Sequence, residues 1–171
     1  MRKATGSAPP RRASLLFLGG SLLVTFLVAA LAGVASAGAG DFYVELTQPP
    51  WAPPGWLFGP VWSVLYALMA VAAWLYWRQA GWEGGRWGLA LYAVQLVLNG
   101  LWSWLFFEWR EGAWAFVEIM LLWITLVATV AVFARRSWLA AGLLVPYLAW
   151  VTFAAALCHT IWQLNPELLG G

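Results

Sequence analysis

Charged residues are scarce in this sequence. They make up 9% of its 171 residues, whereas soluble proteins carry about 25%. Hydrophobic residues make up 63% and occur in long runs, which excludes a soluble globular domain and indicates an integral membrane protein. At roughly 20 apolar residues per crossing, the chain has room for about five or six helices with short loops and none for a second domain.

Cysteine and histidine are nearly absent as well. The one cysteine, Cys158, excludes an internal disulfide and a cysteine-based metal cluster. The one histidine, His159, is a poor metal site alone, and we expect it to lie at the interface or to be hydrogen-bonded. No HExxH, GxGxxG or catalytic-triad spacing is present, so a hydrolase or nucleotide enzyme is unsupported. We therefore predict no metal, no required cofactor and no catalytic residue, and the lack of a continuous basic stripe argues against nucleic acid as a partner.

Five apolar segments are long enough to cross a bilayer, which predicts an all-α membrane protein with a single five-helix bundle. A basic tail, residues 1–13, precedes the first, and a C-terminal tail, residues 167–171, follows the last. The first segment has a second interpretation as a cleaved secretory signal ending at Ala35, Ser36 and Ala37, although its apolar run is longer than a typical signal core. The transmembrane domain is expected at residues 14–166, with helices at about 14–37, 56–77, 87–107, 112–134 and 138–162.

Glycine and proline mark the expected interruptions of these helices. The segment Gly81–Gly85 predicts the turn between the second and third helices. Pro146 should remove the hydrogen bond to the carbonyl of Gly142 and bend the fifth helix.

A proline-rich stretch at residues 48–66 is the most distinctive part of the chain. It reads QPPWAPPGWLFGPVWSVLY, and it holds five of the nine prolines and three of the fifteen tryptophans but no charge. Proline fixes φ and lacks an N–H donor, so the first half should be stiff and extended. We predict that residues 38–55 form a rigid lid joined directly to the second helix, with Trp51, Trp56 and Trp62 directed at the space beneath it. The predicted lid residues are Pro49, Trp51, Pro53, Pro54 and Trp56.

The distribution of basic residues predicts the orientation. Five crossings place eight of the nine lysines and arginines on one side, and Arg110 with five acidic residues on the other. The positive-inside rule then puts the N-terminus in the cytoplasm and the lid and C-terminus outside, as in a bacterial plasma (inner) membrane. The eight residues are Arg2, Lys3, Arg11, Arg12, Arg78, Arg86, Arg135 and Arg136.

Polar and aromatic residues share one face on three of the expected helices. Gln95, Asn99 and Trp102 recur at i, i+4 and i+7 on the third. Such stripes could converge beneath the lid and line a binding cavity, or Gln95 and Asn99 could simply bond between helices. The corresponding residues are Trp62, Tyr66 and Met69 on the second helix, and Tyr147, Trp150, Ala154 and Cys158 on the fifth.

One carboxylate, Glu118, lies well inside an expected span. It is either a ligand or proton site, or a side chain that reaches toward the interface or pairs with a neighbouring hydroxyl.

Three segments resemble the hallmark segments of the TspO/MBR family, the tryptophan-rich sensory proteins and translocator proteins. They are the stretch at 48–66, QLVLNGLWSWLFF from Gln95, and PYLAWVTFAAAL from Pro146, within a match from about Phe42 to Pro166. The resemblance implies a five-helix bundle, usually dimeric, that binds porphyrins such as protoporphyrin IX beneath the first loop. Carried over by position, with Tyr66 added from the second-helix stripe, the predicted ligand-binding residues are Tyr43, Trp62, Tyr66, Asn99, Trp102, Trp114, Trp150 and Ala154.

The sequence departs from the family near the end of the last helix. Many members have asparagine then tyrosine where this chain has Cys158 and His159. The sterol motif of animal members places tyrosine and then arginine where this chain has His159 or Thr160 and then Gln163, so cholesterol is not expected as a ligand. The expected position of His159 near the interface also argues against haem ligation.

These patterns predict a homodimeric membrane protein that binds a tetrapyrrole and senses or moves it. Trp62 and Trp150 would stack on the flat ring, and Asn99 would orient it. The dimer is implied by the resemblance and by small residues at Ala29 and Gly33, with Ala37 following at the same spacing, where another helix could approach closely. Two alternatives stay open: a light-dependent porphyrin-degrading enzyme with tryptophans as electron donors, and a transporter of another small hydrophobic molecule.

Overall fold

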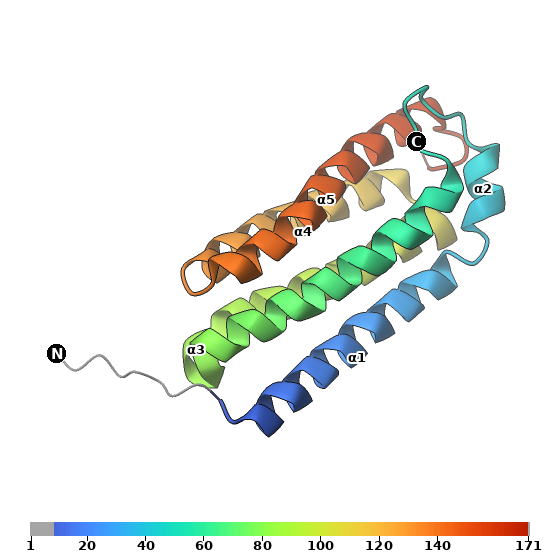
Figure 1. Ribbon diagram of the computed structural model, residues 1–171. Helices are drawn as coiled ribbons and strands as arrows, with labels where there is room; N and C mark the ends of the chain where they lie inside the picture. The colour runs from blue at the N-terminus through green and yellow to red at the C-terminus, as the bar shows by residue number, and fades with distance from the viewer. Residues whose placement is uncertain (1–8, 171) are drawn as a thin grey trace.

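The computed structural model describes residues 9–170, and almost all of this part of the chain is helical. The long helices lie side by side along one direction, with the first described residues at one end of the bundle and the C-terminus at the other (Figure 1). In chain order the elements are α1 (Arg11–Ala35), α2 (Ala39–Glu45), η1 (Gly55–Leu57), α3 (Phe58–Ser103), η2 (Trp104–Glu108), α4 (Gly112–Ala134) and α5 (Trp138–Leu164).

Helix α3 is a hairpin whose two arms lie side by side (Figure 1), and each arm is long enough to cross the membrane once. The chain reverses at Gly81, whose φ of 66° and ψ of −174° lie outside the helical region and favour glycine. Residues 58–80 and 82–103 then run next to each other (Figure 1). They approach so closely that a Cβ at Gly88 would lie 2.5 Å from the ring of Tyr76. Two arms of α3 together with α1, α4 and α5 make five crossings, so the predicted five-helix bundle is confirmed.

Several element ends differ from those expected. The predicted turn at Gly81–Gly85 reduces to Gly81, because residues 82–85 are already helical. The lid is helical in its first half, where α2 occupies Ala39–Glu45, and it is free of helix only from Leu46 to Pro54. The third crossing ends in the wider π-helical turn η2. As expected, Pro146 lies inside the fifth helix, α5.

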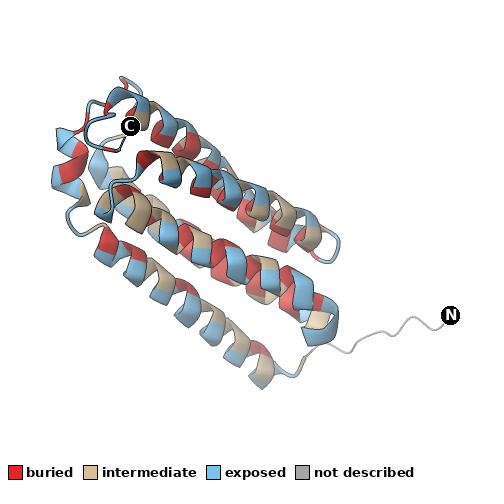
Figure 2. Ribbon diagram, turned by 180° about the vertical axis from the view of Figure 1, so that it is seen from behind, coloured by how far each residue is buried: buried red, intermediate tan, exposed pale blue. Residues whose placement is uncertain are grey.

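The outer surface suits a lipid environment. Four helical stretches are long and apolar enough to cross a membrane, and the hairpin forms one of them. Exposed residues cover the outward faces of the helices (Figure 2), and many are large and apolar, including Leu16, Val97 and Ile124. Soluble proteins rarely expose so much contiguous apolar surface, so these faces are those of a multi-pass membrane protein.

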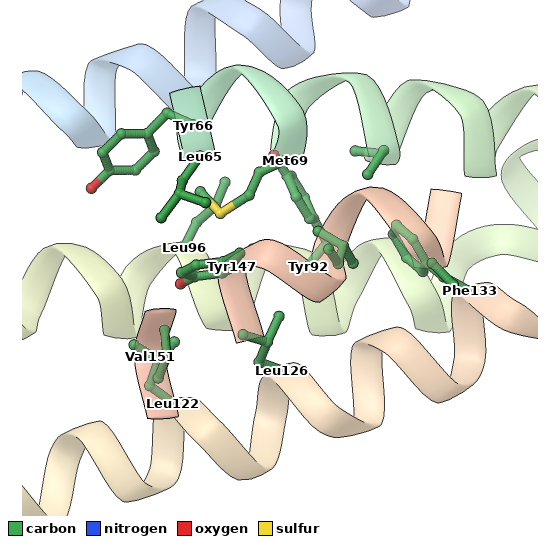
Figure 3. Close-up of a cluster of buried hydrophobic side chains, with 14 of the residues drawn as sticks. Leu65, Tyr66, Met69, Tyr92, Leu96, Leu122, Leu126, Phe133, Tyr147 and Val151 are labelled. Atoms are coloured by element: carbon green, nitrogen blue, oxygen red, sulfur yellow. The ribbon is translucent and has the colours of Figure 1, made fainter. Parts of the chain in front are cut away.

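The core is packed most tightly among α3, α4 and α5. Figure 3 shows its side chains coming from both arms of α3 and from the two later helices. Toward the Gly81 turn, the rings of Tyr76 and Phe133 stack with centroids 4.1 Å apart and planes 2° apart. Leu126, Leu144 and Tyr147 are fully buried members of the same cluster.

Helix α1 is attached to α3 by aromatic packing and by hydrogen bonds. The rings of Phe17 and Trp77 stack with centroids 4.3 Å apart. Three side-chain hydrogen bonds join α1 to α3 between Ser14 and Thr25, and residues 26–35 make none to another described element. The three bonds are Ser21 Oγ to the Ala70 carbonyl at 3.0 Å, Thr25 Oγ1 with Tyr92 Oη at 2.8 Å, and Trp74 Nε1 to Ser14 Oγ at 3.0 Å.

Charge is divided between the two ends. The helix ends and the turn at the Gly81 end carry six arginines and one acidic residue, Glu83, and the lid end carries Arg110 together with acidic residues. Arg2 and Lys3 lie outside the described residues. The arginines of the first end are Arg11, Arg12, Arg78, Arg86, Arg135 and Arg136.

Candidate functional site

A cavity of about 630 Å³ lies at the lid end of the bundle. Helix α1, both arms of α3, α4 and α5 form its walls, and α2 and the start of η1 border it on the lid side. Seven of the eight predicted ligand-binding residues line it, namely Tyr43, Trp62, Tyr66, Asn99, Trp102, Trp150 and Ala154.

Three indoles share this one cavity. Trp62 comes from the first arm of α3, Trp102 from the second arm and Trp150 from α5. The Nε1 atoms of Trp102 and Trp150 are buried and have no hydrogen-bond partner within residues 9–170. Both side chains are only partly buried, so the surface that they offer to the cavity is ring carbon. Such walls suit a flat aromatic ligand.

The indoles are held by further aromatic rings. Trp62 lies against Tyr147 with centroids 6.0 Å apart and planes at 66°. Phe58 meets Trp150 edge-on at 5.9 Å. These edge-to-face contacts fix the orientation of the ring walls before any ligand enters.

A polar centre stands at the inner wall of the cavity. The hydroxyl of Tyr66 donates to Oδ1 of Asn99, and Nδ2 of Asn99 donates to the hydroxyl of Tyr147 at 3.0 Å. Asn99 therefore joins the first arm of α3 to α5 by hydrogen bonds. It also lines the cavity. The two predicted positions for Asn99, between helices and at a cavity wall, are both occupied. Gln95 differs: it is fully buried, does not line the cavity, and its amide has no partner within the described residues.

Helix α1 supplies a wall that the sequence did not reveal. The small-residue spacing at Ala29 and Gly33 predicts a place where another helix can approach, and within this single chain a Cβ at Gly33 would meet nothing within 4 Å. Both residues line the cavity. The spacing itself was the available signal, because small side chains leave space beside a helix. The other lining residues of α1 are Phe26, Ala30 and Ala32.

The roof of the cavity comes from the lid. The hydroxyl of Tyr43 donates to the carbonyl of Pro53 at 3.0 Å, which joins α2 to the extended part of the lid. Burial raises the pKa of Tyr43 above its ordinary value, so the hydroxyl keeps the proton that it donates. Gly55 and Phe58 complete the roof.

The two lid tryptophans lie elsewhere than expected. Trp56 is 73% exposed and does not line the cavity. Trp51 is also largely exposed, and its ring meets Phe153 edge-on at 5.9 Å. Neither residue reaches beneath the lid. The helix-free part of the lid, residues 46–54, is called the strap. Pro49, Pro53 and Pro54 belong to the strap and do not line the cavity.

Three further sequence candidates are not in the cavity. Trp114 is 64% exposed on α4, so it is the one predicted ligand-binding residue outside the lining. Glu118 is buried but is not one of the residues that line the cavity. Neither of its carboxylate oxygens has a hydrogen-bond partner within residues 9–170. His159 is exposed, with its ring 4.9 Å from that of Phe116. The described residues contain no group of three histidine, cysteine or acidic side chains able to hold a metal.

The fold and the cavity define a class: multi-pass membrane proteins that hold an aromatic-walled chamber inside a five-helix bundle. The chain belongs to the TspO/MBR family, whose model matches residues 21–163.

Similar proteins come from bacteria and animals. Protein CrtK of Rhodobacter capsulatus is 40% identical over 149 residues, which cover 84% of this chain and 91% of that protein. Tryptophan-rich protein TspO of Chlorobaculum tepidum is 46% identical over 127 residues, covering 73% of this chain and 80% of that protein. The Translocator protein of Homo sapiens is 39% identical over 132 residues, covering 76% of this chain and 78% of that protein.

Proposed function

We propose that this membrane protein binds a tetrapyrrole of the protoporphyrin IX type in the cavity, and that it acts as a sensor or translocator of that ligand. The observation that carries the proposal is the convergence of Trp62, Trp102 and Trp150 on one chamber of about 630 Å³. Similar proteins named translocator protein and tryptophan-rich sensory protein support the two roles.

The chemistry of the walls favours a large flat ring. The volume falls within the range of about 300–1,000 Å³ that small-molecule sites occupy. Indole surfaces from three sides can stack on or abut the faces of a tetrapyrrole. The Nδ2 group of Asn99 has two N–H donors, and only one of them bonds Tyr147. The other can donate to a polar group at the edge of the bound ring.

A binding titration tests the proposal. Protoporphyrin IX added to the purified protein should quench tryptophan fluorescence saturably. A Trp62→Ala, Trp150→Ala double variant should bind at least about tenfold more weakly, because two aromatic contacts of about 0.5–1.5 kcal/mol each are lost in addition to buried area.

The matched control removes two indoles far from the cavity. Trp87 and Trp138 are 71% and 82% exposed, and neither lines the cavity. A Trp87→Ala, Trp138→Ala variant should keep the affinity of the parent protein. Equal affinities in the two double variants would reject the cavity as the binding site.

A second candidate function is light-dependent breakdown of the bound porphyrin. Three indoles against one ligand are potential electron donors, which is the feature that favours it. Illumination of the complex separates the two functions. A sensor or carrier leaves the porphyrin absorption band intact, whereas an enzyme bleaches it at a rate that falls when Trp62 or Trp150 is replaced by phenylalanine.

We also propose that the protein is a homodimer of a bacterial inner membrane, with its N-terminus in the cytoplasm. The arginines at the Gly81 end and the acidic residues at the lid end support this orientation. Single cysteines placed at Arg86 and at Glu167 in a Cys158→Ala background should react with an impermeant maleimide from opposite sides. Sterol is not part of the proposal, because His159 and Gln163 are exposed and do not line the cavity.

A further inference from the structure

We propose that Asn165 is a positioning residue that clamps the lid over the cavity and thereby controls how fast a ligand enters and leaves. Its Oδ1 accepts a hydrogen bond from the backbone N–H of Thr47 at 2.8 Å. Its Nδ2 donates to the carbonyl of the same residue at 2.9 Å. One amide side chain therefore pairs with both backbone groups of one lid residue, 118 positions away along the chain.

The clamp is itself held rigidly. Asn165 is the residue that follows α5, it is buried, and its Nδ2 also donates to the carbonyl of Ile161 at 2.8 Å. The carbonyl of Asn165 accepts from the backbone N–H of Leu169 at 3.1 Å, and the carbonyl of Leu169 accepts from Gly112 N at 2.8 Å. The backbone of Asn165 is thus tied, through Leu169, to the start of α4, and its amide is oriented by the Ile161 carbonyl of α5.

The clamped residue occupies a decisive place in the lid. Thr47 lies near the start of the strap, between α2, which contributes Tyr43 to the cavity lining, and the prolines that lead to Gly55. Apart from the clamp, two side-chain hydrogen bonds hold this part of the lid, that of Tyr43 to the Pro53 carbonyl and that of Gln48 to the Tyr43 carbonyl. Both join residues within the lid, so they cannot hold the lid to the bundle. The ring of Trp51 also meets Phe153 of α5 edge-on.

Only an amide suits this pairing. An aspartate keeps the acceptor for the Thr47 N–H but loses the donor to the Thr47 carbonyl, and alanine loses both. The lid would remain attached through the buried side chains of Phe42 and Leu46, so the bundle should fold while the strap opens more often.

This consequence for ligands rests on the proposed function. Because Asn165 does not line the cavity, its replacement removes no ligand contact. We expect the association and dissociation rates of protoporphyrin IX both to rise by about tenfold, which is the effect of losing roughly one to two hydrogen bonds from the closed state. The equilibrium affinity should change by less than about threefold.

Two measurements on the full chain in detergent test the clamp. The first is hydrogen–deuterium exchange of the Thr47 amide, which needs no ligand, in Asn165→Ala and in the milder Asn165→Asp. The matched control is Gln163→Ala, which removes an exposed amide two residues earlier. Exchange at Thr47 should speed up by about tenfold in Asn165→Ala and stay at the parent rate in the control.

The second measurement is stopped-flow binding of protoporphyrin IX to the same variants. Trp62→Ala provides the contrast, because it should weaken affinity and leave exchange at Thr47 unchanged. Unaltered exchange at Thr47 in Asn165→Ala overturns the clamp, and faster exchange with unaltered binding rates overturns its control of access. If the parent protein fails to bind protoporphyrin IX, the proposed function fails, and the exchange experiment still decides whether the clamp exists.

Discussion

Replacing Asn99 by leucine should destabilise the bundle by breaking the polar centre of the cavity. The amide accepts from Tyr66 and donates to Tyr147, and neither tyrosine hydroxyl has another side-chain partner within the described residues. Tyr147 is fully buried and Tyr66 is nearly so. Leucine has the same branched skeleton of side-chain heavy atoms as asparagine but is larger, so the change removes hydrogen bonds without opening a hole, and the cavity that Asn99 lines leaves room for the added bulk.

The size of the effect follows from these two bonds. Hydrogen bonds between membrane helices contribute about 0.6 kcal/mol on average and up to about 1.7 kcal/mol, so the pair accounts for about 1–3 kcal/mol. The upper part of this range is expected, because both hydroxyls would be left buried and unpaired. The free energy of unfolding, measured by titration with SDS in mixed micelles, reports this loss directly.

A triple variant gives the reasoning a sharp test. Tyr66→Phe and Tyr147→Phe added to Asn99→Leu remove the stranded hydroxyls, so at least half of the lost stability should return. Gln95→Leu is the matched control, since it removes a fully buried amide with no partner within residues 9–170 and should be neutral or stabilising. If the triple variant is less stable than Asn99→Leu alone, the polar centre is not the source of the effect.

Two glycine substitutions extend these tests to packing and to the cavity. Gly88→Ala should lower the melting temperature, because its Cβ would lie 2.5 Å from the ring of Tyr76 and overpacking costs about 1–3 kcal/mol; Gly142→Ala, with nothing within 4 Å, should not. Gly33→Phe should leave the melting temperature unchanged but fill the cavity and weaken protoporphyrin IX binding by at least about tenfold. Gly19→Phe, on the same helix and away from the cavity, is its control, and equal binding by the two would show that α1 is not a cavity wall.

The sequence was sufficient for the architecture because lipid leaves few choices. Long apolar segments in a chain with so little charge can only be spanning helices, and the turn predicted at Gly81–Gly85 contains Gly81, where α3 reverses. Helix ends were harder to predict. Proline stiffness suggested an irregular lid throughout, whereas Phe42 and Leu46 are buried and allow Ala39–Glu45 to form a short packed helix.

The candidate site was predictable where one helix carries a polar and aromatic stripe. Periodicity brought together Asn99 and Trp102, and the fifth-helix stripe added Trp150, all of which line the cavity. Trp114 was placed by resemblance alone, and its exposed side chain shows the limit of that argument. The wall from α1 was missed because alanine and glycine carry no chemical signal. They contribute by leaving space, which only the arrangement of all five crossings reveals.

The cavity persists because the bundle is unevenly packed. Toward the Gly81 turn, bulky rings such as Tyr76 and Phe133 fill the space between the α3 arms and α4, and polar bonds fasten the first half of α1 there. Toward the lid, the small side chains of α1 face aromatic side chains across empty space. A hollow in a bundle is costly because its lining loses contacts, so the tightly packed half must supply the stability that holds the other half open. Apart from the Tyr66–Asn99–Tyr147 hydrogen bonds, which brace the bundle at the cavity itself, substitutions in the tightly packed half should mainly change stability and substitutions in the cavity lining should mainly change ligand binding.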